Sequence, residues 1–98
     1  MKRTDALQKL RAERDNLRER FGVESLALFG STARDEAGPD SDVDVLVEFG
    51  GPITLFDLVA VQQYLEHCLG VRRVDLVPSD SLYPAFRDDI LGGAVHVG

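Results

Sequence analysis

Residues 29–49 read FGSTARDEAGPDSDVDVLVEF, and this stretch decides the fold of the chain. Its second half, residues 42–49, alternates aspartate with valine and then becomes almost entirely apolar, which predicts a strand. Gly30 and Ser31 end a first strand predicted over residues 24–29, and a short helical turn from Thr32 to Ala37 is predicted to follow. The stretch therefore predicts two strands joined by a helical turn.

Helices are predicted on both sides of this stretch. Apolar residues recur at steps of three and four over residues 3–20, and Gly22 ends that helix. A second long helix follows Thr54, which forms an acidic variant of the capping box with Asp57, and this helix stops at Gly70. Its predicted apolar face consists of Leu55, Leu58, Val59, Leu65 and Leu69.

The C-terminal third of the chain predicts a third strand over residues 71–77, a last helix over 81–91 and a short closing strand over 94–97. Helices that alternate with strands indicate an α/β (α+β) layer fold. We expect a small mixed β-sheet of three to four strands packed by about four helices. A chain of 98 residues is expected to form one domain, residues 1–98, around one core.

The composition argues against several classes of protein. Apolar residues make up 44% and charged residues 29%, as in ordinary globular proteins, and no apolar run approaches the roughly 18 residues of a membrane span. The charged N-terminus lacks the apolar centre of a signal peptide. The single cysteine, Cys68, is predicted to be a small core residue rather than a zinc ligand. We therefore expect a cytoplasmic protein with no membrane association.

The charge of the chain is uneven. Residues 1–20 carry seven basic and four acidic side chains, a balance of +3, so the net charge of −6 leaves −9 on the remainder. An acidic body repels a phosphate polymer, and direct DNA binding is therefore not expected. The same acidic body can attract a basic protein, or metal cations if its carboxylates converge.

Asp42 and Asp44 are the first candidate site residues. Alternate side chains of a strand share a face, so these two aspartates point the same way, with Cα atoms roughly 6.5–7 Å apart. Val43 and Val45 point the other way, toward the presumed core. A divalent cation such as Mg²⁺ would offset the repulsion between the two carboxylates. The alternative is a solvated strand end without a ligand.

Gly30, Ser31 and Asp75 are the other candidates. Glycine allows close approach to the backbone, and a serine that opens a helical turn can contact an anion such as a triphosphate, although a plain helix cap is the alternative. Asp75 interrupts the apolar sequence of the third predicted strand. It is interpreted either as an ion-pair partner of Arg72 or Arg73, or as a third carboxylate beside Asp42 and Asp44.

These motifs together resemble a known family. Gly30-Ser31, ten further residues and then Asp42-Val43-Asp44 resemble the Gly-Ser-x10-Asp-x-Asp pattern of the DNA polymerase β-like nucleotidyltransferase superfamily, and above all its minimal nucleotidyltransferases (MNT). The segment Val74-Asp75-Leu76-Val77 is similar to theirs as well. Thr32 departs from the pattern, because a basic residue is frequent there in the family.

The resemblance implies a nucleotidyltransferase fold and a role for each matched residue. The nucleotide phosphates of ATP would contact three residues of the turn, Gly30, Ser31 and Arg34. Two Mg²⁺ ions would be held by the catalytic carboxylates Asp42, Asp44 and Asp75. The implied partner is a HEPN-type toxin protein, onto a hydroxyl of which AMP would be transferred, so that the chain would be the antitoxin of a toxin–antitoxin pair.

Three classes of function are compatible with these residues. The first is a Mg²⁺-dependent transferase, in which a hydroxyl that arrives on another molecule attacks the α-phosphate of ATP. The second is a non-catalytic module that neutralises a partner protein by covering it, and the third is a subunit of a larger assembly. A second copy of the chain is also a candidate partner. Three retained carboxylates favour the first class.

Overall fold

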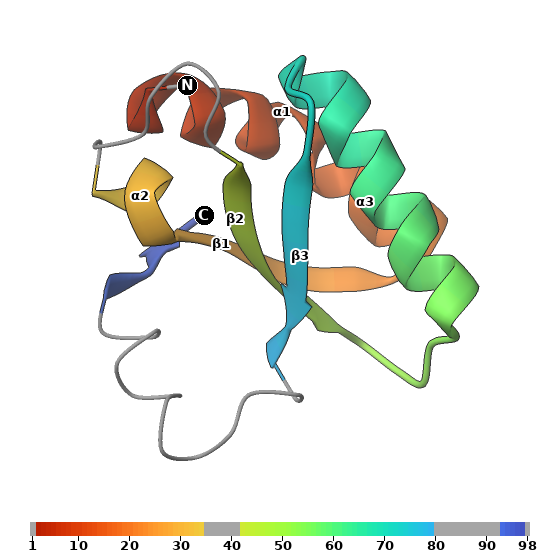
Figure 1. Cartoon of the computed structure of the whole chain (residues 1–98). Coiled ribbons are helices and arrows are strands. Elements are labelled where there is room, and N and C mark those ends of the chain that lie inside the picture. The colour runs from red at the N-terminus through yellow and green to blue at the C-terminus, as the bar shows by residue number, and fades with distance from the viewer. Residues whose placement is uncertain (1, 35–41, 80–92, 98) are drawn as a thin grey trace.

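The computed structural model describes residues 2–34, 42–79 and 93–97, which form the α/β (α+β) fold expected from the sequence (Figure 1). In chain order the elements are α1 (Arg3–Phe21), β1 (Val23–Phe29), α2 (Gly30–Ala33), β2 (Val43–Phe49), α3 (Leu55–Leu69), β3 (Val74–Pro78) and β4 (Val95–His96). The predicted helix over 81–91 lies outside the described residues, so the described part holds two long helices and the one-turn α2.

The four strands form one mixed sheet, as predicted, and their order in it is β3-β2-β1-β4. β1 is antiparallel to β2 and to β4, whereas β2 and β3 are parallel and are joined through α3. A parallel pair needs such a crossover because the second strand must start again from the same end of the sheet. The predicted closing strand is confirmed by β4, which pairs with Ala27 and Leu28.

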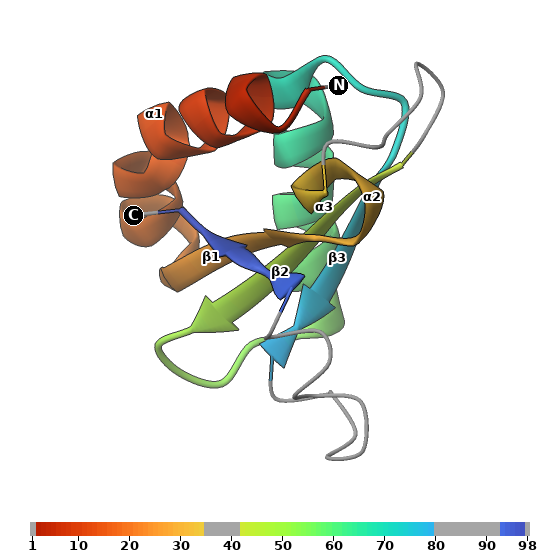
Figure 2. The ribbon, with the colours of Figure 1, turned by 90° about the vertical axis from the view of Figure 1, so that its left-hand side faces the viewer.

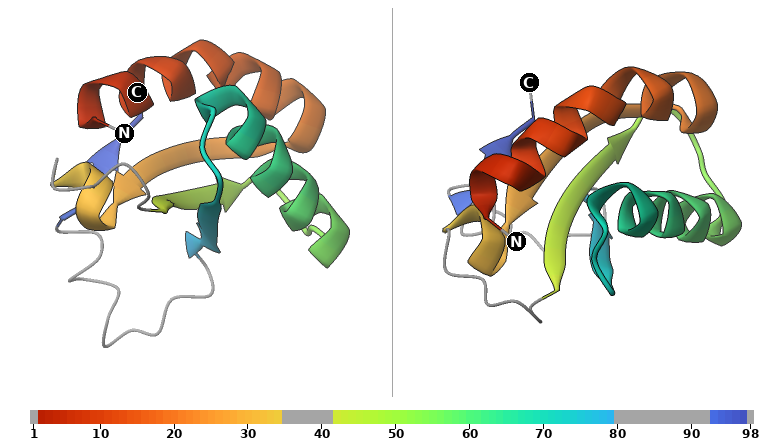
Figure 3. Two further views of the ribbon diagram at one scale, coloured as in Figure 1. Left: turned by 45° about the horizontal axis from the view of Figure 1, so that its top comes forward. Right: turned by 90° about the horizontal axis from the view of Figure 1, so that it is seen from above.

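α1 and α3 pack side by side on one face of this sheet (Figures 2 and 3). Strand residues that point toward the helices alternate with residues that point away, and the first set forms the core. The side chains of this core with the lowest exposure are Leu10, Leu17, Leu26, Leu28, Leu65, Leu69, Val43, Val45, Val47, Val61 and Val74. The opposite face of β2 therefore presents Asp44, Leu46 and Glu48.

The predicted ends of the two long helices are confirmed. Gly22 and Gly70 cap α1 and α3 in the left-handed region, with φ of 71° and 68°. The capping box is present, since Thr54 Oγ1 accepts a hydrogen bond from Asp57 N at 3.3 Å and Asp57 Oδ2 accepts one from Thr54 N at 3.0 Å. The caps fix where α3 begins and ends, and so where β3 can start.

The predicted apolar face of α3 is partly wrong. Leu65 and Leu69 are buried and Leu58 packs against the core, but Leu55 and Val59 are 74% and 40% exposed. The buried stripe also runs through Val61, and on a helix of 3.6 residues per turn Leu55 and Val59 lie roughly a quarter turn away from it. Apolar spacing alone did not distinguish the two stripes.

A polar contact also joins the two long helices. The hydroxyl of Tyr64 on α3 donates a hydrogen bond to the Glu13 carboxylate on α1, and the Tyr64 and Phe21 rings lie 5.5 Å apart between centroids. The Arg20 guanidinium lies 5.3 Å from the centroid of the Tyr64 ring.

Cys68, on the same helix, is half-buried, and burial raises the pKa of its thiol. Neither helix of this pair, nor any other helix described, is long and apolar enough to cross a membrane.

Candidate active site

Asp44 and Asp75 lie side by side on the parallel strands β2 and β3. The register of these strands pairs Val43 with Val74, Asp44 with Asp75 and Val45 with Leu76. Val43, Val45 and Val74 are buried under the helices, so the two aspartates point away from them, on the face of the sheet opposite the helices. The predicted meeting of carboxylates from two neighbouring strands is present for this pair.

The pKa of Asp44 reflects the negative charges that lie near it. Partial burial raises the pKa of the Asp44 carboxyl, and the carboxylates of Asp75 and Asp42 raise it further, while the Arg34 guanidinium acts in the opposite direction. The negative charges of its two neighbours thus make ionisation of Asp44 less favourable than in water. A positive group at this place would relieve that repulsion.

Gly30 brings the backbone of α2 into direct contact with Asp44. Its φ is 69°, in the left-handed region, and a Cβ at this position would lie 2.2 Å from Asp44 Oδ2, far inside van der Waals contact. α2 begins at Gly30 rather than at Thr32, and Arg34 N donates to Gly30 O at 3.3 Å to close the turn. Glycine is therefore required here both by backbone conformation and by space.

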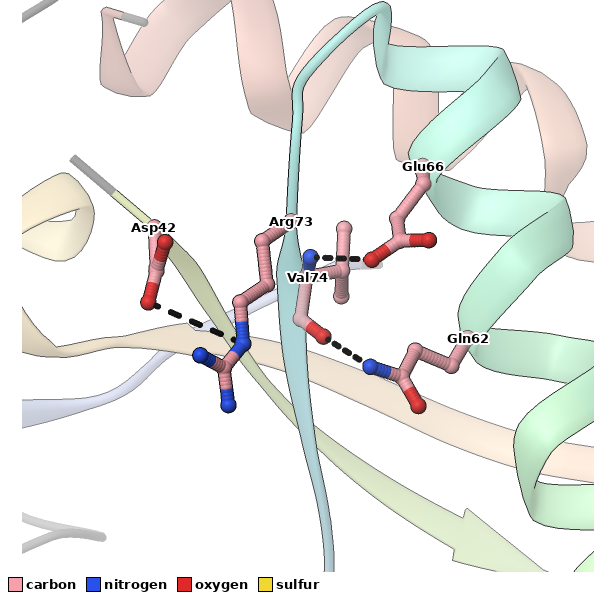
Figure 4. Close-up of polar contacts among 5 residues, drawn as sticks. All are labelled: Asp42, Gln62, Glu66, Arg73 and Val74. Carbon is pink, nitrogen blue, oxygen red and sulfur yellow. Dashed lines mark hydrogen bonds and ion pairs between the residues drawn. The ribbon is translucent and has the colours of Figure 1, made fainter. Parts of the chain in front are cut away.

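Asp42 lies at the start of β2, where it pairs with a basic residue (Figure 4). Arg73, which was one of two arginines considered as a partner for Asp75, has its Nε 3.9 Å from Asp42 Oδ2. The two side chains are 66% and 48% exposed, so water screens the pair strongly. The contact joins the residue before β2 to the residue before β3.

The geometry gives partial support to a metal site. Asp44 and Asp75 fit a divalent cation, because Mg²⁺ in proteins often takes one or two carboxylates and completes its shell with water and substrate phosphates. In the described ranges no group of three or more His, Cys, Asp or Glu side chains is placed to hold a metal ion together. The three-carboxylate set of Asp42, Asp44 and Asp75 stays a prediction.

Asp75 differs in one respect from its sequence-based interpretation. The sequence predicts that it interrupts the middle of a strand over residues 71–77, where a carboxylate would be buried. β3 begins only at Val74, so Asp75 is its second residue and is exposed. An exposed carboxylate needs no ion pair to offset burial, and this removes the structural reason for pairing it with Arg72 or Arg73.

Sequence reasoning missed two residues that act on this strand. Gln62 and Glu66 of α3 form hydrogen bonds with the backbone of Val74, immediately before Asp75 (Figure 4). The available signal was their spacing, since residues four apart on a helix share one side of it. Spacing could not show that this side faces the start of β3.

A hollow of about 280 Å³ lies at the opposite end of β1 from Gly30. It is lined by Arg14, Asp15, Arg18, Val23, Glu24, Ser25 and Val97. Both charge signs are present in this lining, and none of the predicted site residues is part of it. The carboxylate pair and the hollow are therefore separate features of the molecule.

Known proteins resemble the chain along almost its whole length. Residues 10–97 match the nucleotidyltransferase domain family. Protein adenylyltransferase MntA of Thermococcus cleftensis is 44% identical over 88 residues, which are 90% of this chain and 88% of that protein. The solved structure of a protein assigned as a minimal nucleotidyltransferase superposes with a TM-score of 0.76 at 41% identity, covering 97% of this chain and 95% of that one.

A more distant likeness concerns the fold alone. A chain of the solved complex between an MNT antitoxin and the tri-AMPylated HEPN toxin of Shewanella oneidensis gives a TM-score of 0.67 at 19% identity, over 100% of this chain and 72% of that one. The family match, the MntA relative and the motif in residues 30–44 agree with one another. The chain is therefore a nucleotidyltransferase that belongs to the nucleotidyltransferase domain family, within which its sequence resembles the minimal members.

Proposed function

We propose that this chain is a Mg²⁺-dependent protein adenylyltransferase that moves AMP from ATP onto a hydroxyl of a partner protein. The observation that carries the proposal is the register of β2 and β3, which places Asp75 beside Asp44 under the backbone of Gly30. The adenylyltransferase name of the MntA relative supports AMP as the transferred group and a protein as the acceptor.

The proposed site residues form two groups, those that would bind metal ions and those that would bind the triphosphate. Asp42, Asp44 and Asp75 would hold the Mg²⁺ ions, and when bound these ions neutralise the phosphates and stabilise the attacking and leaving oxygens. The triphosphate would lie along α2 and meet Gly30, Ser31 and Arg34. The contact of Gly30 with Asp44 supports this placement, because it brings the proposed phosphate turn against the proposed metal ligands.

The reaction is an in-line displacement at the α-phosphorus of ATP. The acceptor oxygen forms a new bond to this phosphorus, the bond to the bridging oxygen breaks, and pyrophosphate leaves with that electron pair. Asp75 is exposed beside Asp44, and its carboxylate can accept the proton that the acceptor hydroxyl loses. The protein contributes mainly fixed positions and compensating charge, as phosphoryl transfer requires.

A HEPN-type toxin is the proposed partner and acceptor. The support is the solved complex of an MNT antitoxin with an AMPylated HEPN toxin. This chain shares the fold of a chain in that complex. The acidic remainder of the chain, with its balance of −9, favours a partner with a basic surface. The chain would then act as the antitoxin by modifying the toxin.

The test is AMP transfer to a co-purified HEPN-type protein in the presence of labelled ATP and Mg²⁺. We expect the wild-type chain to add AMP to the partner, and Asp44→Asn to add none while it retains the wild-type fold. Glu48→Gln is the matched control, because Glu48 is exposed on the same face of β2. Neutralisation of the partner without any AMP adduct would replace the enzyme by the binding module, and adduct formation by Asp44→Asn would remove the assigned role of Asp44.

A further inference from the structure

Two side chains of α3 hold the start of β3 (Figure 4). Gln62 Nε2 donates a hydrogen bond to Val74 O at 2.9 Å, and Val74 N donates one to Glu66 Oε2 at 3.0 Å. The two residues are one helical turn apart, so both reach the same strand residue. Val74 is fully buried, and its backbone groups need partners inside the protein.

Glu66 also closes the connection between the helix and the strand. Its backbone carbonyl accepts hydrogen bonds from Gly70 N at 3.0 Å and from Val71 N at 3.2 Å, while its carboxylate accepts the bond from Val74 N. Directly before Val74, Arg73 O accepts a hydrogen bond from Val43 N at 3.2 Å, which ties this connection to β2. One residue thus fixes the end of α3, the turn and the first residue of β3.

The sequence of β3 controls its register only in part. Among the described strands, β3 lies at the edge of the sheet with β2 as its neighbour. A one-residue slip would turn Asp75 toward the core and the fully buried Val74 away from it, so the sequence opposes that slip. A slip of two residues keeps every side chain on its own face and replaces Val74 by the similar Leu76 at one core position, and it would move Asp75 by about 6.6 Å along β2.

We propose that Gln62 and Glu66 are positioning residues, which set the register that places Asp75 beside Asp44 by holding both backbone polar groups of Val74. Neither side chain touches the reacting atoms, and both act through the strand. The catalytic consequence rests on the proposed function, whereas the effect on the Asp44–Asp75 pairing does not depend on it.

Substitutions on one side of α3 separate this role from general damage to the helix. Gln62→Leu and Glu66→Leu each remove one hydrogen bond to Val74, whereas Glu66→Gln keeps an acceptor oxygen at the same place. Gln63→Leu is the matched control, since Gln63 is exposed on the same helix. Each leucine variant at 62 or 66 is expected to lower kcat for AMP transfer about tenfold, the factor equivalent to about 1.4 kcal/mol, with a smaller change in KM for ATP. Glu66→Gln and Gln63→Leu are expected to stay within about twofold of the wild type.

Two measurements test the positioning without AMP transfer. In Glu66→Leu, the amides of residues 75–77 are expected to exchange with solvent about tenfold faster than in the wild type, while the amides of residues 26–28 in β1 keep their protection. Titration with Mn²⁺ is expected to show several-fold weaker binding to Glu66→Leu than to Gln63→Leu, because the Asp44–Asp75 pair is less well aligned.

The outcomes distinguish the two proposals. Equal acceleration of exchange in β1 and β3 would show that Glu66 serves global stability alone and would overturn the positioning role, as would unchanged exchange and unchanged Mn²⁺ affinity. A wild-type chain that transfers no AMP would refute the proposed function, yet the exchange and Mn²⁺ data would still decide whether α3 positions Asp75.

Discussion

Substitution of Gly30 by alanine tests the contact on which the site depends. Any L-residue at φ of 69° carries the strain of the left-handed region, about 1–2 kcal/mol. Gly22 supplies a matched control, because its φ is 71° and nothing lies within 4 Å of an added Cβ. Gly22→Ala therefore measures the strain by itself, and Gly30→Ala measures the strain together with the contact to Asp44.

The free-energy cost of placing a Cβ at position 30 against Asp44 follows from the distances. A Cβ at Gly30 would lie 2.2 Å from Asp44 Oδ2, so the carboxylate must retreat by about 1.2 Å to reach an ordinary contact of 3.4 Å. A short side chain achieves this only by leaving its preferred rotamer, at about 1 kcal/mol. We expect Gly30→Ala to lower the free energy of unfolding by about 1 kcal/mol more than Gly22→Ala. A displacement of about 1 Å at a reacting centre should also lower AMP transfer about 100-fold.

Urea unfolding of four variants and an assay of AMP transfer test the contact between Gly30 and Asp44. The variants are Gly22→Ala, Gly30→Ala, Asp44→Ala and the double variant Gly30→Ala/Asp44→Ala. In the double variant the excess cost of Gly30→Ala should disappear, because the remaining Asp44 Cβ would lie at 3.4 Å, an ordinary contact. Equal costs at Gly22 and Gly30, with full AMP transfer by Gly30→Ala, would refute the close approach of α2 to Asp44.

Three further changes give separate tests. Asp44→Asn should leave the free energy of unfolding at pH 7 unchanged or raise it by no more than about 1 kcal/mol, because the raised pKa of Asp44 makes its ionised form unfavourable to folding. Any gain should shrink in acid denaturation as pH falls from the raised pKa of Asp44 toward 3.8, and it should be absent well below 3.8, where the carboxyl is protonated in both states. Tyr64→Phe should cost about 1 kcal/mol by thermal unfolding. That cost should be largest between pH 4.5 and 10, since the pKa of Glu13 is lowered and that of Tyr64 is raised to about 12. It should decline as pH falls from 4.5 through the lowered pKa of Glu13, and as pH rises from 10 through about 12. Arg73→Gln removes a screened pair with Asp42, so Mn²⁺ titration should show binding tightened by no more than about fivefold, with stability unchanged.

Local chemistry explains which parts of the fold could be predicted. Gly22, Gly70 and Thr54 act through their own backbone or the next turn, and all three helix boundaries were confirmed. The alternation of Asp42, Val43, Asp44 and Val45 fixes which side chains share a face, whatever the rest of the chain does. It thus predicted the buried valines and the outward-facing Asp44 correctly.

Tertiary contacts decide the features that were missed. Residues 71–73 have the composition of a strand, but Val71 N bonds back to Glu66 O and closes the end of α3, so β3 begins at Val74. The partner of Arg73 depends on which carboxylate lies nearest after β3 is placed, and that is Asp42. Leu55 has the right spacing for the core and is nevertheless exposed, because the sheet covers a different stripe of α3.

The sheet divides residues that stabilise the fold from residues that would perform the reaction. Val43 and Val45 lie under the helices while Asp44, between them, lies on the opposite face beside the exposed Asp75, so these carboxylates can change at little cost to the core under the helices. Gln62 and Glu66 cross this division, because they belong to the helix layer and act on β3 immediately before Asp75. Loss of AMP transfer with an intact fold should therefore arise from three places, the carboxylates opposite the helices, the α2 turn with Ser31 and Arg34, and this one side of α3. Damage elsewhere in the helix layer should lower stability and activity together.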